Sequence, residues 1–598
     1  MREFGSPPTL APPRSGSLTD DLLANAAEAP DAIALSRREG PRWVGMTCRA
    51  FLEDVRSVAR GLLAAGVGSG DRVALLCATR YEWTLVDYAL WYVGAVTVPV
   101  YESASPEQVS WVLRDSGARA AVVGTPAQRS LVERVAAEDG GRPLLATWVV
   151  ETGAVEELAA AGRLVDDAVL EARRAAVTPD SLATLVYTSG TMGRPRGCML
   201  THGGFMVEAG AAVEELDALF SGEDPSTLLF LPLAHVLARV VQVGAVKARV
   251  RLGHSSEARS LMSDLESFRP TFLLGVPRVF EKVFNTASQR ATADGRARAF
   301  DRSVRTAIAV SRARDDGRPG PLLRLRHRLA ERLVYARVRE SLGGRCRYAV
   351  SGGAPLGERL GHFYRGVGIT VLEGYGLTET TAAVTLNRPD AVKIGTVGRP
   401  LQGVTVRVAD DGELQVRGGQ VFRGYWNDEK ATADAFAPGG WLRTGDVGEI
   451  DDEGFVRVTG RKKEIIVTAG GKNVSPVVLE DGVRAHPLVS QCMVVGDGRP
   501  FVAALVTLDG EAADAWARAH GGRRPLAELA GDPALRAEVQ RAVDEANRAV
   551  SQAEAVRQFL VLPVDWTEEG GQLTPSLKLR RTVVLHQFRG EIEAMYAR

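Results

Sequence analysis

The sequence predicts an α/β protein: a large N-terminal domain of layered α/β subdomains with a small β subdomain, then a small, mobile α+β C-terminal domain. Helical and strand patterns alternate between about residues 18 and 180, which is the rhythm of a layered parallel sheet. Short strand patterns separated by glycine turns follow in the segment 404–449, as in a small β subdomain. Gly460 and the polar run after it mark a hinge, because a smaller region follows the sheet-rich body. We therefore expect three parts: a flexible tail (1–17), an N-terminal domain (18–459) and a C-terminal domain (460–598).

The first elements are predicted from the spacing of apolar residues. Residues 52–63 and 83–93 have apolar side chains at helical spacing, while 72–76 and 119–123 are short apolar runs typical of buried strands. The glycine-rich stretch 66–70 lies between a helix and a strand. Because a dinucleotide-binding fingerprint needs the strand first, this stretch is predicted to be a plain loop.

The composition indicates a soluble globular enzyme or binding protein rather than a nucleic-acid-binding protein. Of 598 residues, 45% are hydrophobic and 24% are charged, so a large core can be buried. Basic and acidic residues balance at 73 each, which argues against a nucleic-acid partner. The five cysteines are scattered without a CxxC pair, which implies neither a disulfide framework nor a zinc site and fits a reducing cytoplasm.

Two stretches of the sequence bear on whether the protein is secreted or crosses a membrane. The tail 1–17 is rich in Pro, Gly and Ser and lacks the apolar core of a signal peptide. The longest apolar run, 88–100, is too short to span a bilayer. We expect a cytoplasmic protein, with a peripheral position at the inner membrane face as the alternative.

The most informative stretch follows an apolar strand at 182–187. Its glycines permit close approach to a ligand, its hydroxyls donate hydrogen bonds, and its arginines offset negative charge. It is not a Walker A loop, because that spacing is absent and Pro195 interrupts any following helix. A surface turn is the alternative, but the pattern favours a polyphosphate-binding loop. Its candidate residues are Thr188, Ser189, Gly190, Thr191, Met192, Gly193, Arg194, Arg196 and Gly197.

This loop resembles the phosphate loop of the AMP-forming adenylating enzymes, the superfamily of acyl-CoA synthetases, luciferases and nonribosomal-peptide adenylation domains. Those enzymes usually carry Lys where this chain has Arg196, which keeps the charge but replaces a mobile ammonium with a planar fork. Within the superfamily, the runs 98–108 and 275–278 look most like bacterial long-chain fatty-acid–CoA ligases. The resemblance covers residues 20–598 and implies ATP and CoA as co-substrates and Mg²⁺ as cofactor.

A second match is the run Leu231–Val236, which contains His235. Alone it reads as a packed strand end; the resemblance implies that His235 walls the pocket for the carboxylate substrate. Leu237 and Ala238 stand where long-chain synthetases often have Phe and Glu, so we expect an altered pocket entrance. The apolar run 271–280 suits a tunnel for an alkyl chain, or equally an ordinary core strand.

The third match places the adenine. A strand runs into the glycine turn formed by Gly352, Gly353, Ala354 and Pro355, which borders adenine in the resembling enzymes. The octapeptide 373–380 follows, in which Tyr375 is expected to stack on adenine and Glu379 to bind Mg²⁺ together with Thr188. A capping role is the alternative for Glu379. The other candidate ATP-binding residues of the octapeptide are Glu373, Gly374, Gly376 and Thr378.

The remaining matches lie near and after the hinge. The resemblance implies that Asp446 accepts hydrogen bonds from the ribose hydroxyls, that Arg461 reaches the ribose, and that Lys463 changes its backbone angles when the small domain turns. Gly470, Gly471 and Lys472 resemble the hairpin that closes on the CoA channel. Lys578 fits the C-terminal lysine motif, although Leu577 stands where the motif often has Gly.

Residues 290–340 are strongly basic, with fourteen Arg against six Asp and Glu. Two solvated helices are one interpretation; a basic amphipathic surface that docks on anionic lipid is the other.

The predicted function is therefore a long-chain fatty acid–CoA ligase that first forms acyl-AMP and pyrophosphate from a fatty acid and ATP, and then a thioester with CoA. In the proposed first step, Lys578 bridges the carboxylate and the α-phosphate. The alternatives are a fatty acyl-AMP ligase that passes the acyl group to a carrier protein, and a non-catalytic lipid- or nucleotide-binding relative. The sequence makes no prediction of oligomeric state.

Overall fold

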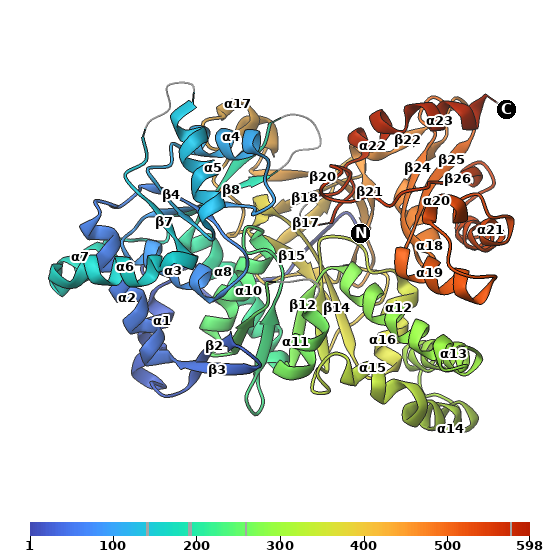
Figure 1. The fold of residues 1–598 in the computed structure, drawn as a ribbon, viewed down its shortest axis with the longest axis horizontal. Helices are drawn as coiled ribbons and strands as arrows, with labels where there is room; N and C mark the ends of the chain where they lie inside the picture. Colours follow the sequence, from blue (N-terminus) through green and yellow to red (C-terminus); the bar gives the residue numbers. More distant parts are fainter. Residues whose placement is uncertain (139–142, 189–193, 257–259, 575–576, 598) are drawn as a thin grey trace.

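The computed structural model describes residues 1–138, 143–188, 194–256, 260–574 and 577–597. The N-terminal part forms several sheets with helices around them, and the C-terminal part forms a separate group of strands and helices at one end of the molecule (Figure 1). The predicted α/β class is confirmed.

The first sheet has six strands in the order β7-β6-β4-β5-β8-β9. Its strands β4 to β8 are parallel where they pair, and β9 returns antiparallel to β8. The predicted strands at 72–76 and 119–123 correspond to β4 and β6; the predicted helix 52–63 lies within α2, and the predicted helix 83–93 corresponds to α3, which ends one residue earlier. The bounds are β4 (Arg72–Leu76), β5 (Val96–Val100), β6 (Ala120–Val123), β7 (Thr147–Val149), β8 (Leu182–Thr188), β9 (Arg196–Thr201), α2 (Cys48–Ala64), α3 (Tyr81–Tyr92) and α4 (Pro106–Ser116).

Two further sheets continue the body. One has the order β10-β11-β2-β3, and the other the order β12-β13-β14-β15-β16 with its first three strands parallel. The bounds are β2 (Ile33–Glu39), β3 (Arg42–Thr47), β10 (Ser226–Leu229), β11 (Arg251–His254), β12 (Phe272–Gly275), β13 (Tyr348–Ser351), β14 (Thr370–Leu377), β15 (Ala382–Leu386) and β16 (Arg399–Pro400). The carboxyl ends of β12, β13 and β14 open into three of the predicted site segments.

A buried ion pair ties together two elements that carry site residues. Arg239 lies on α10 (Val236–Lys247), and its guanidinium donates to the Asp87 carboxylate of α3 at 2.5 and 2.8 Å, with both side chains fully buried. Arg239 also donates to the hydroxyl of Thr184 on β8 at 2.5 Å. Removing either charge would leave the other unpaired in the core. The N-terminus of α10 is thus held against the strand that leads into the phosphate loop.

A helical layer covers the third sheet. Phe280, Phe284, Phe300, Phe363 and Tyr364 form much of its core. The layer lies at the lower right of the molecule (Figure 1). Its elements are α12 (Pro277–Ala293), α13 (Ala297–Asp315), α14 (Pro321–Ala330), the π-helical turn η4 (Glu331–Tyr335), α15 (Ala336–Glu340) and α16 (Glu358–Gly366).

The small β subdomain includes the start of the chain. Where the sequence predicted a flexible tail, β1 (Glu3–Gly5) pairs antiparallel with β17 (Thr405–Val408), and the N-terminal ammonium donates to the carbonyl of Ile450 at 2.8 Å. Phe4 also packs against Gly454. The other strands are β18 (Glu413–Arg417), β19 (Phe436–Ala437), β20 (Trp441–Ile450) and β21 (Val456–Arg461).

The C-terminal part has a sheet and cores of its own. Strand β24 runs antiparallel to β25, and β26 runs parallel to β25, with apolar clusters on the two faces. The predicted hinge position Gly460 lies within β21, and Lys463 follows in the 3-10 turn η6 (Lys462–Glu464). The remaining bounds are β22 (Ile466–Val467), β23 (Asn473–Val474), α18 (Pro476–Arg484), β24 (Val489–Val495), β25 (Val502–Leu508), α19 (Gly510–Ala519), α21 (Pro533–Asn547), β26 (Val556–Val561), α22 (Arg581–Gln587) and α23 (Arg589–Tyr596).

Within the described parts of the chain, none of the helices combines the length and the apolar character needed to cross a bilayer.

Candidate active site

Three predicted residues from distant parts of the sequence meet: Tyr375 of β14, Asp446 in the middle of β20, and Arg461 at the end of β21. Asp446 and Arg461 face each other across the β20–β21 pair, with Arg461 Nε 3.0 Å from Asp446 Oδ1. The Tyr375 hydroxyl donates to Asp446 Oδ2 at 2.6 Å. Burial raises the pKa of Asp446, and the Arg461 charge and the Tyr375 hydrogen bond oppose that rise. Each carboxylate oxygen still has a free lone pair for a ligand hydroxyl.

Glu379 has a partner that the sequence did not predict. It lies in the 3-10 turn η5 (Thr378–Thr380), and its Oε1 accepts a hydrogen bond from the Tyr425 hydroxyl at 2.7 Å. The ring of the same tyrosine lies under the Arg196 guanidinium, 5.5 Å from ring centre to Cζ. Burial and the Glu379 charge raise the pKa of Tyr425, so its hydroxyl stays protonated and donates. Tyr425 therefore connects the phosphate-loop arginine to Glu379.

The base of the phosphate loop is supported by aromatic side chains. The Trp111 indole on α4 donates to the carbonyl of Pro195 at 2.8 Å, and its ring lies under Arg194 at 4.7 Å. Gly197 packs against the Tyr187 ring, since an added Cβ would come within 3.1 Å of it. Thr188 ends β8, opposite Arg196. Five candidates, Ser189, Gly190, Thr191, Met192 and Gly193, lie outside the described residues.

Lys578 reaches this site from the C-terminal part of the chain. A Cβ added to Gly353, in the loop after β13, would lie 3.8 Å from Lys578 Cε. The Lys578 side chain is exposed to solvent at its surface, but protein atoms surround its ammonium group. Burial lowers the pKa of this ammonium, and the Arg461 charge lowers it further. The negative charges of Asp446 and Glu379 act in the opposite direction. The lysine thus shares one electrostatic environment with the predicted ribose and metal residues.

The residue before this lysine adopts a backbone conformation that suits glycine. Leu577 has φ of 60°, in the left-handed region that side chains with a Cβ seldom occupy. This is the position at which the resembling enzymes often have Gly. The Lys578 backbone N–H donates to the Thr574 hydroxyl at 3.0 Å, which closes the turn.

His235 caps α10 and lies near the same lysine. Its Nδ1 accepts a hydrogen bond from the Leu237 N–H at 3.2 Å. Burial, with a contribution from the Lys578 charge, lowers the pKa of His235 to about 3, so the imidazole is neutral at ordinary pH. Leu237 packs toward Gly352, whose added Cβ would lie 3.6 Å from Leu237 Cδ2. Leu237, which stands where long-chain synthetases often have Phe, therefore faces the loop predicted to border adenine.

The glycines beside Tyr375 have a packing role that the sequence did not predict. A Cβ on Gly376 would lie 1.5 Å from the Ala382 carbonyl oxygen of β15, and one on Gly374 would lie 2.8 Å from Leu386 Cδ1. Both glycines let β14 and β15 approach closely. Gly352 differs, because its added Cβ would meet only ordinary contacts, the nearest at 3.6 Å.

Glu373 binds the backbone directly after the loop 352–355, which is predicted to border adenine. Its Oε1 accepts from the Leu356 N–H at 2.9 Å. Burial raises the pKa of Glu373 to about 7, and the charges of Asp481 and Glu358 add to the rise.

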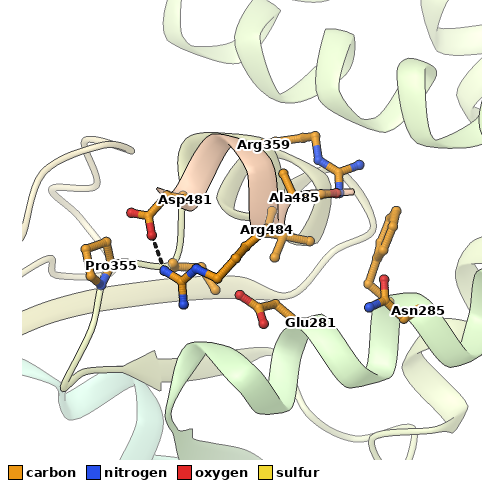
Figure 2. Close-up of a pocket in the computed structure, with 11 residues that line it drawn as sticks. Glu281, Asn285, Pro355, Arg359, Asp481, Arg484 and Ala485 are labelled. Atoms are coloured by element: carbon orange, nitrogen blue, oxygen red, sulfur yellow. Dashed lines mark hydrogen bonds and ion pairs between the residues drawn. The ribbon is translucent and has the colours of Figure 1, made fainter. Parts of the chain in front are cut away.

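Two arginines of the N-terminal part bind backbone carbonyls of the C-terminal part. Arg278 donates to the Ser490 carbonyl and to its hydroxyl, each at 3.0 Å, and Arg359 donates to the Ala485 carbonyl at the end of α18 at 2.7 Å. Figure 2 shows Arg359 and Ala485 beside Glu281 and the Asp481–Arg484 ion pair, around a small pocket lined by both parts. These contacts accompany the orientation in which Lys578 lies at the site.

The predicted CoA-channel hairpin makes different contacts. Lys472 Nζ lies 3.5 Å from Glu554 Oε1, and the hydrogen bonds described for 468–472 join the hairpin to itself or to Arg499. Among the described residues, no hydrogen bond or ion pair joins Gly470, Gly471 or Lys472 to Lys578.

Comparisons with known proteins identify the family of the chain. The model of the AMP-binding enzyme family matches residues 22–426, and that of the AMP-binding enzyme C-terminal domain matches residues 463–598. The chain is 48% identical to the long-chain-fatty-acid–CoA ligase FadD15 of Mycobacterium bovis, over 100% of both chains.

Solved structures share the fold. The adenylation domain of carboxylic acid reductase from Segniliparus rugosus, in complex with AMP and a carboxylic acid, superposes with a TM-score of 0.76 at 22% identity, covering 97% of this chain and 94% of that one. O-succinylbenzoate CoA synthetase from Bacillus subtilis, in complex with ATP and magnesium, has a TM-score of 0.67 at 22% identity, covering 94% and 98%.

Proposed function

The chain belongs to the family of AMP-binding enzymes, and from this premise we propose that it is a long-chain fatty acid–CoA ligase that works through an acyl-adenylate. The observation that carries the proposal is the position of Lys578, whose Cε would lie 3.8 Å from a Cβ at Gly353 and whose ammonium is within the influence of the Arg461, Asp446 and Glu379 charges. Full-length identity of 48% to a long-chain-fatty-acid–CoA ligase supports the substrate class.

In the first step, an oxygen of the fatty-acid carboxylate attacks the α-phosphorus of ATP, the bond to the β-phosphate breaks, and pyrophosphate leaves. A carboxylate needs this activation because oxide would otherwise be its leaving group. Positioning and charge neutralisation supply most of the catalysis in such displacements. We assign Lys578 to the carboxylate and α-phosphate oxygens, the Arg194 and Arg196 side chains to the β- and γ-phosphates, and Asp446 with Arg461 to the ribose.

His235 has a passive part in this proposal. Its neutral imidazole, capping α10, forms a wall of the carboxylate pocket without adding a charge that would compete with Lys578. The adenine lies between Tyr375 and the loop 352–355.

The residues near Glu379 fit a magnesium ion that the substrate brings with it. The described residues contain no group of three or more His, Cys, Asp or Glu side chains able to hold a metal ion. Glu379 would supply one carboxylate and Thr188 one hydroxyl, and Mg²⁺ typically takes one or two carboxylates, with phosphates and water as its other ligands. Bound there, the ion would shield charge on the departing pyrophosphate. Tyr425 orients Glu379 for this role.

In the second step, the CoA thiol releases its proton to water and its sulfur attacks the acyl carbon, the bond to the AMP oxygen breaks, and AMP leaves. We propose that the C-terminal domain turns about Lys463 between the steps, withdraws Lys578, and brings the hairpin at Gly470, Gly471 and Lys472 to the thiol route.

The test is fatty-acid-dependent ATP–pyrophosphate exchange over a panel of carboxylic acids from acetate to very long chains. Thioester formation is then compared with CoA and with a phosphopantetheine carrier protein as acceptor. We expect exchange with long-chain acids and turnover with CoA. Transfer only to the carrier would indicate an acyl-AMP ligase, and absence of exchange with every acid would indicate a non-catalytic binding protein.

We also propose that the enzyme is cytoplasmic and that its basic segment 290–340 contacts an anionic membrane. Long-chain fatty acids partition into bilayers, so such a contact would bring the enzyme to its substrate.

A further inference from the structure

Helix α14 is fixed to the helical layer along one face only. His327 Nε2 donates to the Gly366 carbonyl at 2.7 Å, and its ring lies 5.0 Å from that of Tyr335. Ala330 is buried. These side chains share the inward face and hold the helix at the edge of the molecule (Figure 1).

The opposite face carries a row of exposed leucines. Leu322, Leu325 and Leu329 are 60%, 55% and 59% exposed. Residues at spacings of three and four lie on one side of a helix, so the three form a single apolar stripe pointing to solvent. Single exposed leucines are ordinary on protein surfaces, but an aligned row opposite an anchored face indicates a contact surface.

Positive charge flanks this stripe. Arg324, Arg326 and Arg328 alternate with the leucines and are exposed, and α14 contains no Asp or Glu. The next acidic residue, Glu331, pairs with Arg339. The neighbouring α13 exposes Arg302 and Arg305, with one exposed acidic residue, Asp301, beside them. Any partner must therefore offer an apolar layer beside dense negative charge.

An anionic phospholipid bilayer has that chemistry. Arginine side chains can lay their apolar stems on the stripe and extend their guanidinium groups to lipid phosphates. The layer that holds α14 also reaches the site, because α12 follows Val276, whose Cγ1 would lie 3.8 Å from a Cβ at Gly353.

We propose that α14 docks on anionic lipid with Leu322, Leu325 and Leu329 inserted at the membrane interface and Arg324, Arg326 and Arg328 among the headgroups. This identifies the face used in the membrane contact proposed above and rests on that contact. The proposed partner of this face is a bilayer. If the partner were instead a second copy of the chain or an acidic protein, substitution of these leucines and arginines would leave vesicle binding unchanged.

The test is flotation of the full-length protein with vesicles of phosphatidylcholine, alone or with about one third phosphatidylglycerol. The triple variant Leu322→Ser, Leu325→Ser, Leu329→Ser removes the stripe. The triple variant Arg324→Gln, Arg326→Gln, Arg328→Gln removes the charge. Matched controls are Leu164→Ser, at a leucine 98% exposed, and Arg163→Gln with Arg173→Gln, all in the part of the chain near α6 (Ala154–Ala161) and α7 (Asp167–Ala175), far from α14 (Figure 1).

We expect wild type and controls to bind anionic vesicles about tenfold better than neutral ones, and salt to weaken that binding. The leucine variant should bind anionic vesicles at least about fivefold more weakly, and the arginine variant should lose the preference for anionic lipid. Both should retain the circular dichroism of wild type. Equal binding by wild type and the two variants would overturn the proposal, as would a wild-type dimer that becomes monomeric in the leucine variant without any change in vesicle binding.

ATP–pyrophosphate exchange with octanoate, an acid that is soluble without vesicles, tests the ligase activity separately from membrane docking. Unchanged exchange with lost flotation supports the docking face. No exchange in the wild type with octanoate or with any other acid of the panel would reject the ligase assignment and leave the flotation result to decide the docking face on its own.

Discussion

Tyr425 joins two charged groups that lie far apart in the sequence. Its hydroxyl donates to Glu379, and its ring supports Arg196. Tyr425→Phe keeps the ring and removes only the hydroxyl. Because partners of a metal ligand fix its orientation, we expect the Mg²⁺ concentration for half-maximal ATP–pyrophosphate exchange to rise about tenfold, with normal thermal stability.

Tyr92→Phe is the matched control, since it removes a similar hydrogen bond, to Glu171 Oε1 at 2.6 Å, from a tyrosine of α3 that is not among the proposed site residues. An unchanged magnesium requirement in Tyr425→Phe would contradict the positioning role of Tyr425.

Glu373 makes stability depend on pH. Its pKa in the folded protein is about 7, above the ordinary value of 4.5, so the folded state holds a proton that the unfolded state releases. A raised pKa gives a contribution that is complete below the unfolded value and is lost as the pH rises through the folded value. The contribution should therefore fall between pH 4.5 and 7, by about 3 kcal/mol at most.

Glu373→Gln tests this, because the amide oxygen can still accept from the Leu356 N–H. We expect the variant to unfold at a higher denaturant concentration than the wild type at pH 8 and to show a much smaller advantage at pH 5. A difference that does not change with pH would show that the carboxyl is ionised in the folded state.

Strands β14 and β15 approach too closely for a side chain at position 376. Gly376→Ala would put a methyl group 1.5 Å from the Ala382 carbonyl oxygen, so the strands must separate. We expect a loss of more than about 3 kcal/mol of unfolding free energy, and low soluble yield.

Gly352→Ala is the comparison, because its added Cβ meets nothing closer than 3.6 Å. It should fold with near-normal thermal stability but bind ATP more weakly, since the methyl group projects from the loop predicted to border adenine. Normal stability of Gly376→Ala in chemical denaturation would refute the packing role of Gly376.

The periodic elements of this fold can be predicted from sequence, and its close contacts cannot. Apolar spacing alone predicts β4 and α2, because burial follows the local pattern. Strand β1 has only three residues, and its partner β17 lies far along the chain, so no local signal reveals it. The spacing of β14 from β15, which requires Gly376, likewise appears only when both strands are in place.

The polar residues of the site could be predicted because they lie in recognisable motifs. The residues that orient them lie outside those motifs and could not be predicted. Asp446, Arg461, Tyr375 and Lys578 carry the polar groups that a nucleotide needs, and the structure brings them together. Tyr425 and Trp111 act through an orientation that depends on tertiary contacts.

At the scale of the whole molecule, the C-terminal domain supplies Lys578 to the proposed site, and we propose that this domain turns away between the two steps. Lys578 comes from the C-terminal part, and the direct hydrogen bonds that Arg278 and Arg359 make with that part end on Ser490 and Ala485. A hydrogen bond from a charged group contributes about 1.5–3 kcal/mol. Contacts of this strength can break when the bound ligand changes. This balance suits an enzyme that must present Lys578 for one step and withdraw it for the next.

The most direct measurement compares the two half-reactions of Lys578→Ala with those of the wild type and of Lys282→Ala, an exposed lysine on α12. The account predicts that fatty-acid-dependent ATP–pyrophosphate exchange falls by about 100-fold or more in Lys578→Ala alone. Thioester formation from preformed acyl-AMP and CoA should stay within about twofold of wild type in both variants. An equal loss in both half-reactions of Lys578→Ala, or full exchange activity without the lysine, would contradict the claim that the C-terminal domain completes the adenylation site and then leaves it.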